Sequence, residues 1–116
     1  MRIISQDGTI DVPYDYFSLS MSSGKYKDVE VAYIYCHNLS SPNGTKLAEY
    51  SAKAKAIKAM EMLRKVYEDN EFYHYMSTTD TFEKATSCLS NEEFKELTSE
   101  YFQFPQDDEI EVWVWD

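Results

Sequence analysis

Alternation of apolar and polar positions predicts several β-strands in the first fifty residues. Asp7 and Gly8 stand between two short β-branched runs, which is the strongest short-range signal for a hairpin. Pro13 closes the second run, as expected for the end of a strand or an edge position. A turn region at residues 22–25 and a stretch rich in turn formers at 38–44 separate the following strands. These further strands are predicted at residues 16–22, 29–37 and 46–50.

Apolar side chains recur at spacings of three and four over residues 52–68, which predicts the main helix. Ser51 is the expected N-cap. The apolar stripe consists of Ala52, Ala56, Ala59, Met60, Leu63, Val66 and Tyr67. The solvent side would carry Lys53, Lys55, Lys58, Glu61, Arg64 and Lys65. Because alanine is small, the stripe indicates close approach of the helix to a sheet.

The pattern after residue 68 is less regular. Residues 72–75 fit either a continuation of the helix or the start of a strand. Ser90 and Glu93 match a capping box, which predicts a second helix that ends near Tyr101. Residues 109–115 alternate between apolar and polar positions and predict a terminal strand.

Together these elements predict one α+β domain over residues 1–116. An antiparallel sheet of about five strands would pack against one main helix, with an additional helical segment in the acidic C-terminal half. Residues 1–68 would form the sheet and main helix, 69–101 an appended acidic segment and 102–116 the closing strand. A length of 116 residues with 43% hydrophobic content suits a single buried core.

Neither a membrane segment nor a secretion signal is indicated. The chain has no run of about 18 apolar residues, and its first residues lack the basic and apolar regions of a signal peptide. We therefore expect a cytoplasmic protein without a membrane partner. In that compartment Cys36 and Cys88 are expected to be reduced thiols.

The residues that could carry chemistry form no recognisable constellation. Cys36 and His37 are neighbours, and neighbours in a strand point to opposite faces, so they cannot chelate one metal together. Three glycines leave no material for a phosphate-binding loop. Nothing in the sequence pairs a Ser or Cys nucleophile with a base by a local signature. We expect no metal, no cofactor and no enzymatic activity.

The charge of the chain is unevenly distributed. Residues 1–67 contain nine Lys and Arg against seven Asp and Glu, whereas residues 68–116 contain two against fourteen. The whole chain carries a net charge of -10. Binding to phosphates needs clustered cations, so nucleic acid is not an expected direct partner.

An acidic surface can instead imitate the phosphate array of a nucleic acid and attract a basic nucleic-acid-binding protein. The contrasting interpretation is that acidity only keeps the protein soluble while the aromatic residues fill its core. If Ile110, Val112 and Val114 face the core, two tryptophans share an outer face with Glu111 and could anchor a partner. The predicted partner-binding residues are Glu92, Glu93, Glu96, Glu100, Asp107, Asp108, Glu109, Trp113 and Trp115.

Three stretches of the sequence, taken together, resemble those of a known group of proteins. They are ISQDGTIDVPY at residues 4–14, KAIKAMEMLRK at 55–65 and FQFPQDDEIEV at 102–112. The combination resembles a family of small proteins carried by prophages and mobile elements of Gram-positive bacteria. The likeness covers the first 68 residues and about the last 15, whereas residues 69–101 do not follow the pattern. The strings look structural, so no catalytic residue is carried over.

The resemblance implies a mobile-element context, in which small acidic proteins often inhibit host defence. By analogy, we expect a phage or mobile-element anti-defence protein in the cytoplasm of the bacterial host. It would be a stoichiometric inhibitor of a nucleic-acid-binding effector such as a CRISPR nuclease, as anti-CRISPR proteins are. The alternative is a non-enzymatic scaffold or regulatory module that acts as a homo-oligomer through a sheet edge or exposed tryptophans. The sequence is compatible with a monomer or a homodimer.

Overall fold

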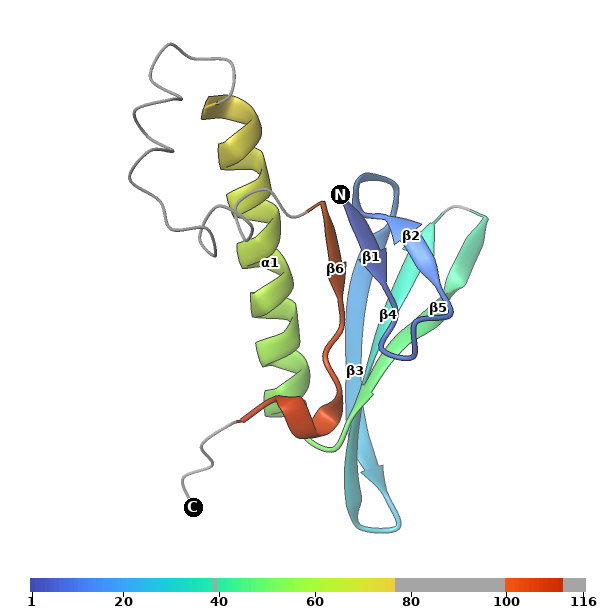
Figure 1. Ribbon diagram of the computed structural model, residues 1–116. Helices are drawn as coiled ribbons and strands as arrows, with labels where there is room; N and C mark the ends of the chain where they lie inside the picture. Colours follow the sequence, from blue (N-terminus) through green and yellow to red (C-terminus); the bar gives the residue numbers. More distant parts are fainter. Residues whose placement is uncertain (39, 77–99, 112–116) are drawn as a thin grey trace.

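The computed structural model describes residues 1–38, 40–76 and 100–111 (Figure 1). Within these ranges the chain has an α+β fold, with two three-stranded sheets beside one main helix. The strands are β1 (Arg2–Ile4), β2 (Asp11–Pro13), β3 (Ser18–Tyr26), β4 (Val29–Asn38), β5 (Ser41–Tyr50) and β6 (Tyr101–Gln103). The helices are α1 (Lys53–Met76) and the 3-10 turns η1 (Tyr14–Tyr16) and η2 (Asp107–Glu109). The predicted α+β class is confirmed, but two small sheets replace the single five-stranded one.

The first sheet has the strand order β2-β1-β6. β1 and β2 form the predicted antiparallel hairpin, with Ile3 opposite Val12. β6 pairs with the other side of β1 in parallel, with Ile3 opposite Phe102. The closing strand is therefore β6. Residues 109–111 do not form the predicted terminal strand, and residues 112–115 lie outside the described residues. The prediction of purely antiparallel pairing was wrong. The intervening chain, including α1, provides the long crossover that a parallel pair requires.

The turn between β1 and β2 is held by the Asp7 carboxylate. Its Oδ1 atom accepts hydrogen bonds from the Ser5 hydroxyl at 2.7 Å, and from the backbone N–H and hydroxyl of Thr9 at 3.0 and 2.7 Å. These hydrogen bonds favour the ionised form of Asp7 and lower its pKa to about 2, and the bond from Ser5 makes the largest contribution. Gly8 supplies the positive φ of 78° that closes the turn.

The second sheet has the order β3-β4-β5. β3 and β4 pair without interruption from Ser18 opposite His37 to Tyr26 opposite Val29. The turn lies at Lys27 and Asp28, both with positive φ. The predicted turn at residues 22–25 was wrong, because these residues lie within β3. The hairpin turn comes later, at two residues that both adopt the positive φ that a two-residue turn of this kind needs.

β5 begins at Ser41, so the predicted exposed connection at 38–44 is largely strand. The register shift between Cys36 and Asn38 accommodates the turn-forming residues 42–44 within the pairing, and a second shift lies between Ile34 and Tyr35, opposite Leu47. Gly44 has a φ of 84°, and the ring of His37 packs on it so closely that a Cβ atom there would lie 2.5 Å from Cε1. Glycine is therefore the residue that fits this bulge.

The helix α1 is longer than predicted, because residues 72–75 continue it to Met76. Its first turn is not capped by Ser51. The backbone N–H of Lys53 donates to the Glu30 carboxylate of β4 at 2.9 Å, and Ser51 donates to Asp107 instead. Tyr101 lies in β6, so the predicted second helix does not reach it. Residues 77–99, which contain the rest of that prediction, and 112–116 lie outside the described residues.

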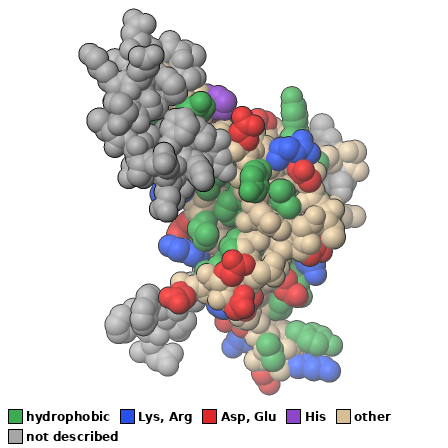
Figure 2. Space-filling view, in the orientation of Figure 1, with side chains coloured by type: hydrophobic (Ala, Val, Ile, Leu, Met, Phe, Trp, Pro, Cys, Tyr) green, Lys and Arg blue, Asp and Glu red, His purple; other side chains and the backbone are tan. Residues whose placement is uncertain are grey.

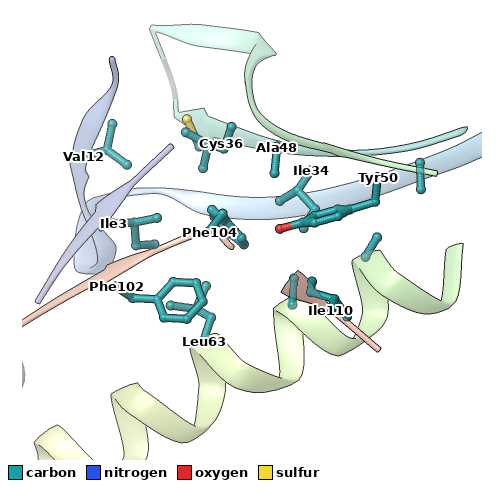
Figure 3. Packing of buried hydrophobic residues seen from close by; sticks show 14 residues of the cluster. Ile3, Val12, Ile34, Cys36, Ala48, Tyr50, Leu63, Phe102, Phe104 and Ile110 are labelled. Carbon is teal, nitrogen blue, oxygen red and sulfur yellow. The ribbon is translucent and has the colours of Figure 1, made fainter. Parts of the chain in front are cut away.

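The core lies between α1 and the two sheets (Figure 3). The predicted helix stripe is confirmed at Ala56, Ala59 and Leu63, which are buried. Asn70 extends the buried side of the helix, although a polar residue was not predicted there. The remaining buried apolar residues include Ile3, Val12, Ala32, Ile34, Cys36, Leu47, Ala48, Tyr50, Phe102, Phe104 and Ile110. Burial raises the pKa of the Cys36 thiol, because a thiolate is disfavoured there.

Gln6 joins three segments that are far apart in the chain. Its side-chain amide donates to the carbonyls of Glu49 and Pro105, both at 3.1 Å, and accepts from the Glu49 N–H at 3.0 Å. Its backbone N–H donates to the Leu47 carbonyl at 2.8 Å, and its carbonyl accepts from the Gln106 amide at 2.7 Å. The amide of Gln6 thus pairs with β5 much as a neighbouring strand would.

The substitution Gln6→Glu is expected to lower the free energy of unfolding by about 1–2 kcal/mol. A carboxylate cannot donate to the Glu49 and Pro105 carbonyls and would face them with like partial charge. Equilibrium unfolding in urea at neutral pH measures the loss. Gln103→Glu is the matched control, because that amide makes a single 3.4 Å hydrogen bond to the Ser5 carbonyl. Equal losses in the two variants would contradict the assigned role of Gln6.

Candidate interaction surface

Cavities lined by described residues include two that bear on a possible site. One, of about 220 Å³, lies between the β1–β2 turn and β5, and the other, of about 360 Å³, lies between the start of β3 and α1. The first is lined by Gln6, Asp7, Lys46, Leu47, Ala48 and Glu49. The second is lined by Tyr14, Phe17, Ser18, Leu19, Met60, Leu63 and Arg64. Neither lining places a nucleophile next to a base, and Gln6 and Asp7 already hold the turn.

The pair of Ser20 and His37 comes nearest to a catalytic geometry. The Ser20 hydroxyl lies 2.5 Å from Nε2 of His37, and Nδ1 lies 3.1 Å from the Pro42 carbonyl. If Nδ1 donates to that carbonyl, Nε2 accepts from the serine. No local spacing in the sequence indicates this pair, because its members come from different strands. Neither Ser20 nor His37 lines either cavity. We interpret the pair as a structural support of the bulge, because the His37 imidazole packs on Gly44.

No metal site is formed by the described residues, since no three His, Cys, Asp or Glu side chains gather among them. Cys36 faces the core and His37 the opposite side of β4, as the alternation of the strand predicts. No helix in residues 1–38, 40–76 and 100–111 is long and apolar enough to cross a membrane.

Four of the predicted partner-binding residues lie within the described ranges. Glu100 is exposed, and its carbonyl accepts from the Arg2 N–H at 2.9 Å. Asp107, Asp108 and Glu109 form η2. The others, Glu92, Glu93, Glu96, Trp113 and Trp115, lie outside the described residues.

Asp107 is occupied by contacts within the chain. Its carboxylate accepts from the Ser51 N–H at 2.7 Å and from the Ser51 hydroxyl, and the Lys55 ammonium lies 3.3 Å away. Burial acts to raise the pKa of Asp107, but the hydrogen bonds from Ser51 and Lys55 outweigh it and hold the pKa below its ordinary value. Asp107 therefore fastens the C-terminal segment to the start of α1.

The neighbouring carboxylates are directed to solvent. Ile110 is only 5% exposed and anchors the segment in the core, whereas Asp108, Glu109 and Glu111 are exposed around it. Glu109 also accepts from the Gln106 N–H at 2.9 Å, which closes the turn. We call residues 107–111 the acidic turn. Its exposed carboxylates are those of Asp108, Glu109 and Glu111. Asp107 and Ile110 hold the backbone on the two sides of Asp108 and Glu109.

Basic side chains accompany the acidic ones elsewhere on the surface. Figure 2 shows Asp and Glu interspersed with Lys and Arg on the face in view. Among the described residues the ion pairs are Arg2 with Asp11, Lys55 with Asp107 and Lys65 with Asp69. None of these pairs includes a carboxylate of Asp108, Glu109 or Glu111.

Comparison of the chain with protein-family models, with curated proteins and with solved structures found no match.

Proposed function

We propose that this chain is a non-enzymatic anti-defence protein of a phage or mobile element. It would bind a basic nucleic-acid-binding effector stoichiometrically, such as a CRISPR nuclease, and occupy the groove that holds DNA or RNA. The acidic turn would take the place of backbone phosphates in that groove.

The proposal rests chiefly on the display of Asp108 and Glu109 between Asp107 and Ile110, with the exposed Glu111 next to them. A phosphate mimic must hold its charges in place before binding, because ordering them on contact would cost free energy. Ile110 in the core and Asp107 on Ser51 and Lys55 provide that rigidity. The net charge of -10 adds long-range attraction toward a basic partner.

A DNA-cleavage assay with purified RNA-guided nucleases from Gram-positive bacteria tests the proposal. Cleavage by a susceptible nuclease should fall in proportion to the added chain and cease near one chain per nuclease. Inhibition should weaken as ionic strength rises, because salt screens the attraction. Nucleases that cut at full rate with excess chain at low salt would count against the proposal.

Charge reversal in the acidic turn tests which surface is responsible. The double variant Asp108→Lys with Glu111→Lys should raise the inhibitory concentration by about tenfold or more, because close charge pairs across an interface couple strongly. Glu61→Lys with Glu68→Lys changes the net charge equally at exposed sites of α1, and serves as the control. If the two double variants lose the same inhibition, net charge alone acts and the acidic turn is not the contact.

A further inference from the structure

The two outer strands of the second sheet differ in how their edges are protected. β5 contains Pro42 and two register shifts, and Gln6 occupies its Leu47 carbonyl and Glu49 N–H. Proline, bulges and covering groups are the means by which proteins prevent edge strands from pairing with other chains. The edge of β5 is therefore closed.

The edge of β3 has none of these features. Its pairing with β4 is unbroken over nine residues, and from Ser18 to Gly24 it contains no charged residue and no proline. No other strand among residues 1–38, 40–76 and 100–111 pairs with its outer side. The regular and uncharged stretch from Ser18 to Gly24 is a template for an additional strand.

The side of β3 that faces α1 is also incompletely covered. Leu19 and Met21 stand opposite Cys36 and Ile34, so they share the core side of the sheet, yet both are only half-buried. The cavity of about 360 Å³ separates Leu19 from Met60 of α1. A strand added beyond β3 would place further side chains over this opening and extend the core.

The two ends of β3 carry complementary groups. Asp15 is exposed before the strand, and Lys27 is exposed just after it. Tyr16, in η1, and Tyr26, the last residue of β3, are 78% and 70% exposed. Figure 1 shows the β3–β4 hairpin, which carries Tyr26, extending beyond the rest of the described chain.

An antiparallel arrangement about Met21 would bring these groups together. Asp15 and Tyr16 lie in η1, just before the N-terminal end of β3, whereas Tyr26 ends the strand and Lys27 follows it. A second copy running in the opposite direction therefore brings the end of its β3 that follows Asp15 beside the end that precedes Lys27. Two-fold symmetry forms each contact twice. The same alignment keeps Leu19 and Met21 of both copies on one side of the sheet, because side chains alternate with a period of two.

We propose that β3 is a dimerisation edge, which pairs antiparallel with β3 of a second copy of this chain to form one continuous six-stranded sheet. The partner is another copy because the charges and tyrosines at the two ends of the strand complement each other. The acidic turn is not part of this contact, so dimerisation and the inhibitory function can be tested separately.

Sedimentation velocity of the full chain over a range of concentrations tests the dimer. The expected result is a concentration-dependent shift from the 13.6 kDa chain to twice that mass. The variants Lys27→Glu and Asp15→Lys, each alone, should weaken the dimer about tenfold, because each places like charges together twice. The double variant Asp15→Lys with Lys27→Glu should restore wild-type association, since the pair is only exchanged.

Matched variants on α1 complete the experiment. Lys58→Glu and Glu61→Lys change exposed charges away from β3 and should leave the dimer unchanged. Circular dichroism of each variant verifies the fold before sedimentation. A chain that stays monomeric at every concentration would overturn the proposal. A dimer that is insensitive to the single variants, or one that the double variant fails to restore, would overturn the antiparallel β3 contact.

Discussion

Replacing Phe104 by alanine should lower the free energy of unfolding by about 3–5 kcal/mol, the usual cost of truncating a buried phenylalanine. Phe104 is 1% exposed and meets the ring of Phe102 edge-on, with centroids 5.3 Å apart. Figure 3 shows it among buried residues of both sheets, above α1. Its backbone N–H donates to the Ile4 carbonyl and remains in the variant, so the loss reports packing.

Guanidinium-induced unfolding followed by circular dichroism measures this loss. Phe72→Ala removes the same ring from α1, where it is 53% exposed, and should cost under about 1 kcal/mol. The comparison separates burial from the generic effect of losing an aromatic residue. Similar losses in the two variants would show that Phe104 does not join the sheets as described.

Gly44→Ala should lower the free energy of unfolding by roughly 2 kcal/mol or more. A residue with a Cβ atom in the left-handed region costs roughly 1–2 kcal/mol. The added methyl would also displace the His37 ring, from which it would be 2.5 Å away, and weaken the ring's contacts with Ser20 and Pro42. The bulge between β4 and β5 should therefore resist any side chain at this position.

Thermal unfolding of Gly44→Ala beside Gly24→Ala makes the test specific. Gly24 has no positive φ, and a Cβ atom there would meet nothing within 4 Å. Its replacement should be neutral or stabilise by about 0.5 kcal/mol, because alanine loses less backbone entropy than glycine on folding. A Gly44 variant that melts with the wild type would contradict the described bulge.

Local pattern was sufficient to predict the elements whose causes are local. The Asp7-Gly8 hairpin follows from turn chemistry, and the stripe through Ala56, Ala59 and Leu63 follows from helical periodicity. The boundaries were less accurate where the cause is remote. The N–H of Lys53 is capped by Glu30 of β4 rather than by Ser51, a contact that no local spacing indicates.

The division into two sheets could not be predicted, because it depends on pairing between distant segments. Gln6 binds β5 and the Pro105 carbonyl, and Phe102 pairs with Ile3. The contacts of Gln6 with Pro105 and of Ile3 with Phe102 join residues 99 positions apart, and that of Gln6 with Glu49 joins residues 43 positions apart, so they leave no periodic signal. The same limit applies to the interaction surface, where sequence alone could not distinguish Asp107, which is held by Ser51 and Lys55, from the exposed Asp108 beside it.

The parallel pairing of β1 with β6 has a consequence for synthesis. β3, β4 and β5 pair with their neighbours in the chain, so they can meet as soon as they leave the ribosome. Ile3 precedes Phe102 in the chain by 99 positions, so during synthesis it receives Phe102 and Phe104 long after it has been made. The β1–β2 hairpin can therefore meet β5 early, but part of its apolar side stays exposed until β6 has been synthesised.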